Sequence, residues 1–170
     1  LVTMFSGTKA MVALAFSMLV DRGRFDEDAP VSSHWPAFAS KGKAAITGRM
    51  LLEHRSGLLG FDEPITLDML ERRPADVVGV LERAAPHWTP DSAQGYHAVS
   101  YGLYAGELFR RVTGESVGTF FRREVAQPLG AEVFMGLPAE FEPRVAPIIP
   151  LTQRERFSVG SRQQRHRARQ

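Results

Sequence analysis

The sequence of 170 residues contains no cysteine, so disulfides and thiolate metal sites are excluded. It also lacks a long hydrophobic run. Its longest apolar stretch, residues 10–20, is shorter than the ~20 residues that a helix needs to cross a bilayer. No basic segment precedes this stretch and no small-residue cleavage site follows it, as a signal peptide would require. We therefore expect no membrane span, and the compartment that the sequence favours is the cytoplasm.

The chain also lacks a strong excess of positive or negative charge outside its C-terminal end. The net charge is +2, but residues 151–170 hold six arginines and one glutamate. The other 150 residues hold 15 basic and 18 acidic side chains, which gives no reason to expect nucleic-acid binding. We predict one domain over residues 1–150, followed by a disordered Arg-rich tail over residues 151–170. An alternative is that the tail binds nucleic acid or an acidic surface, which predicts steeply salt-dependent binding.

Convincing β-strands are missing as well. Residues 2–4 and 145–149 are the only candidates, and prolines weaken the second one. Apolar periodicity and capping residues instead predict a mainly α chain. Trp35 and Phe38 are the expected core anchors of the segment that follows the first helix. The predicted helices cover about residues 6–21, 47–54, 67–72, 74–85, 99–112 and 117–125.

Ser6 and Lys9 lie three residues apart where the first predicted helix begins, so their side chains share a face of it. At a helix start, unpaired backbone N–H groups and the positive end of the dipole favour developing negative charge. A serine hydroxyl becomes a nucleophile when a base takes its proton, and a lysine can be that base if burial lowers its pKa. A simple N-cap serine is the alternative interpretation of this pattern.

Two later segments supply further candidate residues. Residues 53–58 read Glu-His-Arg-Ser-Gly-Leu, after a helix for which Thr47 is a plausible N-cap. His54 in this segment could take part in catalysis, but a structural histidine that bonds a loop backbone is the favoured interpretation. Residues 88–90 read Trp-Thr-Pro and begin an irregular loop that leads to Tyr96.

These motifs occur in a recognisable order. Ser6-Gly7-Thr8-Lys9, the His-x-Ser-Gly-Leu segment, the Trp-Thr-Pro loop with Tyr96, and the Gln-Pro-Leu-Gly turn at 127–130 resemble those of the β-lactamase-like serine hydrolases. That group contains class C β-lactamases, D-Ala-D-Ala carboxypeptidases and family VIII carboxylesterases. The resemblance covers about residues 1–140. It implies the helical portion of the α/β fold of β-lactamases and transpeptidases.

The resemblance also implies a mechanism. Ser6 would attack the carbonyl of a small-molecule ester or amide to form an acyl-enzyme, while Lys9 and Tyr96 share the proton. Backbone N–H groups, including that of Ser6, would hold the oxyanion. A phenol has an ordinary pKa near ~10, so Tyr96 can act as a base only if a cation such as Lys9 stabilises its phenolate. We expect no cofactor and no metal.

The chain departs from the family pattern in two ways. Ala98 stands where the β-lactamases carry asparagine, with His97 beside it. We expect both residues to contribute to substrate binding, and the missing amide favours an esterase over a β-lactamase or carboxypeptidase.

The second departure is the absence of the Lys-Thr-Gly or His-x-Gly strand that lines the site in the family. We therefore expect a truncated chain that lacks most of the central antiparallel sheet. A truncated homologue without activity is the alternative to an active esterase. Without a sheet to cover residues 10–20, we also expect marginal stability or self-association through this apolar helix.

Overall fold

The computed structural model describes residues 1–149, which divide into two compact units. The smaller unit combines Leu1–Thr3 with the chain from Pro138 onward, and its described part contains the short helix η5, Ala139–Arg144. In this unit the N-terminal ammonium of Leu1 donates to the carbonyl of Arg144 at 2.7 Å. The Arg-rich tail predicted at 151–170 lies outside the described residues, so the boundary at residue 150 stays a prediction.

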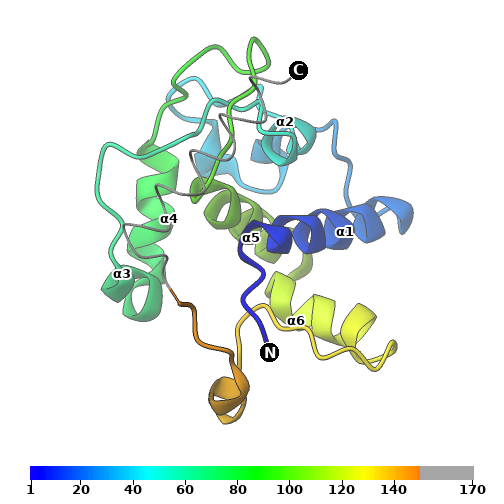
Figure 1. The fold of residues 1–170 in the computed structure, drawn as a ribbon. Helices are drawn as coiled ribbons and strands as arrows, with labels where there is room; N and C mark the ends of the chain where they lie inside the picture. Colours follow the sequence, from blue (N-terminus) through cyan, green and yellow to red (C-terminus); the bar gives the residue numbers. More distant parts are fainter. Residues whose placement is uncertain (150–170) are drawn as a thin grey trace, which may run out of the picture. The chain divides into compact units, whose positions relative to one another are not determined.

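The larger unit, Met4–Leu137, holds the remaining helices (Figure 1). Residues 1–149 contain no β-strand, apart from an isolated bridge between Pro30 and Thr47. The mainly α prediction is therefore confirmed for this part of the chain, and the two strand candidates at 2–4 and 145–149 are wrong. In chain order the helices are η1 (Phe5–Gly7), α1 (Thr8–Asp21), η2 (Val31–Ser33), η3 (Pro36–Ala39), α2 (Gly48–Leu52), α3 (Leu67–Arg72), α4 (Pro74–Arg83), α5 (Ser100–Thr113), α6 (Val117–Phe121) and η4 (Arg122–Ala126).

Local capping explains why several helix ends lie where the sequence predicts them. The side chains of Thr47 and Thr66 each accept the backbone N–H three residues on and so begin α2 and α3. Pro74 begins α4, and Gly114 ends α5 in the left-handed region, with a φ of 83°. Helix α6 is shorter than predicted because the chain passes at Arg122 into the π-helical turn η4.

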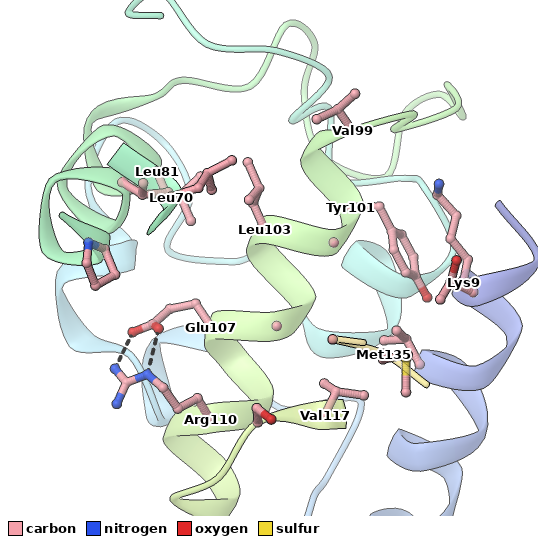
Figure 2. Close-up of a pocket in the computed structure, with 18 of the residues that line it drawn as sticks. Lys9, Leu70, Leu81, Val99, Tyr101, Leu103, Glu107, Arg110, Val117 and Met135 are labelled. Carbon is pink, nitrogen blue, oxygen red and sulfur yellow. Dashed lines mark hydrogen bonds and ion pairs between the residues drawn. The ribbon is translucent and has the colours of Figure 1, made fainter. Parts of the chain in front are cut away.

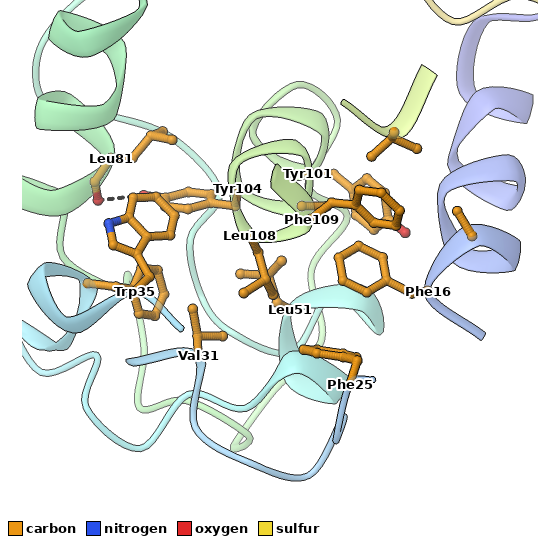
Figure 3. Close-up of a cluster of buried hydrophobic side chains, with 14 of the residues drawn as sticks. Phe16, Phe25, Val31, Trp35, Leu51, Leu81, Tyr101, Tyr104, Leu108 and Phe109 are labelled. Atoms are coloured by element: carbon orange, nitrogen blue, oxygen red, sulfur yellow. Dashed lines mark hydrogen bonds between the residues drawn. The ribbon is translucent and has the colours of Figure 1, made fainter. Parts of the chain in front are cut away.

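Aromatic side chains from distant segments form the core of the larger unit (Figure 3). Phe16 of α1 meets Phe109 of α5 edge to face, with ring centroids 5.2 Å apart. Trp35 and Phe38, both fully buried as predicted, lie 6.4 and 5.9 Å from the ring of Tyr104 on α5. Such aromatic pairs contribute beyond the area that they bury. Helix α5 is thereby packed against α1 on one side and against the segment of η2 and η3 on the other.

Lys43 ties the loop after η3 to the end of α4. Its side chain is fully buried, and its Nζ donates to the carbonyl of Glu82 at 2.7 Å and to the carbonyl of Ala84. The last carbonyls of a helix have no partner within the helix, so Lys43 satisfies groups that burial would otherwise leave unpaired. Burial in turn lowers the pKa of Lys43 to about 8.

Within the described part of the chain, helix α1 is covered on one side. Ala15, Phe16 and Leu19 are buried, whereas Leu14 is 46% exposed. Within residues 1–149, no helix has the length and apolar character that a bilayer crossing requires. The expected self-association through α1 stays a prediction.

Candidate active site

Three side chains from two distant parts of the sequence meet at the start of α1. Ser6 and Lys9 come from η1 and the first turn of α1, and Tyr96 comes from the loop that precedes α5. The Tyr96 hydroxyl donates to Ser6 Oγ at 2.5 Å, and Lys9 Nζ donates to the same oxygen at 3.3 Å. The structure therefore brings together the three residues that the sequence singled out for catalysis. Ser6 Oγ therefore accepts hydrogen bonds from both a phenol and an ammonium group.

The backbone holds Ser6 in an exposed and strained turn. Phe5, directly before it, has a φ of 46°, in the left-handed region that side chains other than glycine seldom adopt. Non-glycine residues in this region cost about 1–3 kcal/mol and cluster at functional sites. The turn places Ser6 one residue before the N-cap of α1, Gly7, where helical N–H groups lack partners within the helix.

Lys9 is held by oxygen atoms and aromatic faces. Besides its bond to Ser6, its Nζ donates to the carbonyl of Ala98 at 2.9 Å. The same atom lies 4.9 Å from the ring centroid of Tyr96 and 5.6 Å from that of Tyr101. Cation–π contacts at these distances attract an ammonium group. The position of Lys9 is thus fixed by four neighbours, and one of them is the proposed nucleophile.

The surroundings of Tyr96 favour its ionised form. Its hydrogen bond with Ser6, then its hydrogen bond with Lys9 and the charge of that ammonium, hold the pKa of Tyr96 below the ordinary value of 10.0. A phenolate at this position would accept hydrogen bonds from both neighbours. A tyrosine can act as a base only if a cation stabilises its phenolate, and Lys9 is placed to do so.

The two residues expected to bind substrate lie in different surroundings. Ala98 is exposed, and its carbonyl is the oxygen that accepts from Lys9. His97 is only 2% exposed, and its ring bonds His54 Nδ1 through Nδ1 and Ser56 Oγ through Nε2, at 3.2 and 3.0 Å. Burial, then the neighbouring His54, lowers the pKa of His97 to about 4. The structure does not bring this imidazole to Ser6, and a role in substrate binding stays a prediction for both residues.

An apolar groove of about 610 Å³ adjoins Lys9 and straddles α5 (Figure 2). Lys9 lies on the α1 side of α5, and the ion pair of Glu107 with Arg110 lies on the other side. The absence of side chains at Gly102 and Gly106 leaves the middle of the groove open. The remaining walls are mostly aliphatic and include Val12, Val77, Val78, Leu81, Leu103, Val117 and Met135.

Two features of the site were missed by sequence reasoning. Tyr101 was not among the candidate site residues, yet its buried ring lies beneath Lys9 Nζ, and burial raises the pKa of this phenol to about 12. No pattern in the sequence identifies this contact, because it forms across the fold between α1 and α5. The carbonyl of Ala98 left no signal, because a backbone oxygen is present at every position in a sequence.

Comparisons with known proteins show what this chain is similar to. The Beta-lactamase family model matches residues 1–162. The esterase/beta-lactamase LipL of Mycobacterium tuberculosis is 37% identical over 150 residues, which are 85% of this chain and 34% of LipL. The chain therefore spans about a third of the length of this relative.

Solved structures give the same picture. A penicillin-binding protein homologue from Caulobacter crescentus superposes with a TM-score of 0.82 at 40% identity, over 89% of this chain and 40% of that one. A family VIII carboxylesterase superposes with a TM-score of 0.80 at 39% identity, over 86% of this chain and 41% of that one. The described helices therefore correspond to the helical portion of the β-lactamase/transpeptidase fold.

Proposed function

The chain belongs to the Beta-lactamase family, and from this premise we propose that it is a serine hydrolase of the carboxylesterase type with Ser6 as its nucleophile. One observation carries the proposal. Ser6 Oγ lies 2.5 Å from the hydroxyl of Tyr96 and 3.3 Å from Nζ of Lys9. A nucleophile within hydrogen-bond reach of a base that a third group orients is the arrangement that covalent catalysis requires.

In the proposed first step, Ser6 Oγ attacks the carbonyl carbon of an ester while its proton passes to the phenolate of Tyr96. Lys9 stabilises that phenolate and can relay the proton to the leaving alcohol. In its neutral form Tyr96 donates to Ser6, and after losing its proton it accepts from Ser6 instead. The lowered pKa of Tyr96 supports this exchange of roles.

In the proposed second step, water attacks the acyl carbon and its proton passes to the phenolate of Tyr96. Tyr96 then returns this proton to Ser6 Oγ as the bond between the acyl carbon and Oγ breaks, which releases the acid and restores Ser6. The backbone N–H of Ser6, before the N-cap of α1, would donate to the oxyanion in both steps. The positive end of the helix dipole acts in the same direction.

An ester substrate is favoured over a β-lactam for two reasons. The methyl group of Ala98 cannot bond a carboxamide, and the groove beside Lys9 offers an apolar surface to an acyl chain or an alcohol. The names of LipL and of the family VIII carboxylesterase add weight to this choice, because both include esterase activity. A β-lactamase or D-Ala-D-Ala carboxypeptidase activity is the less favoured option within the same mechanism.

A catalytically inactive homologue is the second candidate. It is favoured by the lack of any strand beside Ser6 within residues 1–149. A second oxyanion donor from such a strand would then be missing, and loss of one donor costs about 10²–10³-fold in rate.

An active-serine phosphonate probe distinguishes the two candidates. The proposal predicts one covalent adduct per chain on Ser6, found by peptide mass spectrometry, and no adduct in Ser6→Ala. Ser17→Ala is the matched control, because Ser17 lies on α1, which directly follows η1, and its hydroxyl donates to the carbonyl of Ala13. Folded wild-type protein that stays unmodified would support the inactive homologue and overturn the proposal.

A further inference from the structure

His54 binds the backbone on both sides of Tyr96. Its carbonyl accepts the N–H of Gly95 at 3.1 Å, and its ring Nδ1 accepts the N–H of His97, also at 3.1 Å. His54, at the C-terminal end of α2, therefore accepts hydrogen bonds from the residue before Tyr96 and from the residue after it. The structural role that the sequence favoured for His54, a hydrogen bond to a loop backbone, is confirmed.

His54 occupies a position where the backbone favours glycine. Helix α2 ends in a Schellman motif, in which the N–H of Arg55 bonds the carbonyl of Met50 at 2.8 Å and the N–H of His54 bonds that of Leu51 at 3.4 Å. This motif puts His54 in the left-handed region, with a φ of 64°. A side chain in this conformation costs about 1 kcal/mol or more relative to glycine. The imidazole is therefore present at a position where the local fold would be less strained without it.

The ring of His54 also supports the ring of Tyr96. The two ring centroids lie 5.1 Å apart. On its other contact, the His54 ring lies 5.0 Å, between centroids, from the ring of Tyr101, which belongs to α5. Tyr96 is 56% exposed, so burial alone does not fix the direction of its side chain. The contacts with His54, together with Lys9 above the ring, define where the hydroxyl points.

The hydrogen bonds around His54 require its ring to be neutral. Nδ1 must carry a lone pair to accept the N–H of His97, so the ring proton is assigned to Nε2. His97 then donates from its own Nδ1 to His54 and accepts the Ser56 hydroxyl proton at Nε2. Burial, and then the positive charge of Lys9, lower the pKa of His54, which favours this neutral form.

We propose that His54 is a positioning residue that holds the phenol of Tyr96 against Ser6. The inference rests on the proposed function, since it concerns the group that would take the proton from Ser6. Without the imidazole, Gly95 keeps its bond to a backbone carbonyl, but His97 loses its acceptor and the Tyr96 ring loses one wall. The phenol is then free to leave Ser6 and Lys9.

Titration of the tyrosines tests this inference without requiring turnover. The chain has three tyrosines, and burial raises the pKa of Tyr101 to about 12 and that of Tyr104 further still. The first tyrosinate to form with rising pH, seen by its near-ultraviolet absorbance, is therefore Tyr96. Its loss in Tyr96→Phe verifies the assignment.

Three substitutions, at two residues whose backbone is in the left-handed region, test the inference. In His54→Gly the first tyrosinate step is expected to move up toward pH 10.0, the ordinary value, because the contacts with Ser6 and Lys9 are lost. His54→Asn suits the same backbone and carries an amide oxygen in place of Nδ1, so it should stay near wild type. Lys41→Gly, at an exposed position with a φ of 57°, is the control and should not shift the step.

A first step that stays at the wild-type pH in His54→Gly would overturn the inference. Both His54 variants suit the left-handed backbone, so they are expected to fold, and circular dichroism verifies this. A shifted titration in a chain that no phosphonate labels would show that His54 positions Tyr96 although the proposed function fails. An unshifted titration in a labelled chain would show the reverse.

Discussion

Replacing Tyr96 by phenylalanine is expected to lower the rate of ester hydrolysis by about 10²–10⁴-fold, the usual contribution of a positioned general base. The substitution removes only the hydroxyl, 2.5 Å from Ser6 Oγ, and leaves the ring that contacts Lys9 and His54. Substrate binding should change little, so the loss is expected in kcat rather than in KM. Steady-state kinetics with a short-chain p-nitrophenyl ester measures both constants.

Tyr101→Phe is the matched control, because it removes a hydroxyl from the other ring beneath Lys9. It should keep most of the activity. The pH profile gives a second readout: the wild-type rate should rise with pH as Tyr96 ionises, at a pH below 10.0, and Tyr96→Phe should lack this rise. Equal losses in the two variants, or a full rate in Tyr96→Phe, would show that Tyr96 is not the base.

Replacing Gly118 by alanine is expected to cause the largest loss of stability. A Cβ at this position of α6 would lie 1.9 Å from the backbone carbonyl oxygen of Met135, a distance that no real contact tolerates. Either the segment around Met135 or α6 itself must move, and overpacking of this kind costs about 1–3 kcal/mol or more. We expect the free energy of unfolding to fall by about 3 kcal/mol, measured by urea denaturation.

Gly106→Ala offers the same chemical change with the opposite expected sign. Apart from its chain neighbours and the backbone of α5 itself, no atom lies within 4 Å of a Cβ at Gly106, and alanine in a helix is more stable than glycine by about 0.5–1 kcal/mol. The free energy of unfolding should therefore rise. If the two variants change stability by the same amount, the close contact between α6 and Met135 does not exist in solution.

Much of the helical arrangement follows from local signals. Thr66, Pro74 and Gly114 each fix a helix end through their own side chain or backbone preference, and the structure places those ends where the sequence did. Two details were less well predicted: residues 30–39, which contain η2 and η3, were expected to be short helix or coil, and the helix expected to end near residue 125 was not expected to become π-helical in η4. The shape of these segments depends on how Phe38, Phe120 and other buried side chains pack against distant helices.

The candidate site likewise has one part that local sequence signals predict and another that depends on long-range contacts. The pairing of Ser6 with Lys9 is local, since residues three apart on a helix share a face. The approach of Tyr96 is a long-range contact over 90 residues of sequence, and it was predicted only through the resemblance to a family. The part played by His54 combines a helix end, a strained backbone and a contact across the fold. The spacing of residues along the sequence does not reveal this combination of features.

Hydrolysis of a short-chain p-nitrophenyl ester by wild type and Ser6→Ala, measured side by side, tests the central claim most directly. The claim is that Ser6, activated by Lys9 and Tyr96, attacks an ester carbonyl. It predicts turnover by the wild type that falls at least about 10³-fold in Ser6→Ala, since loss of a nucleophile removes most of the catalysis. Equal rates in the two proteins, or no turnover by folded wild type, would contradict it.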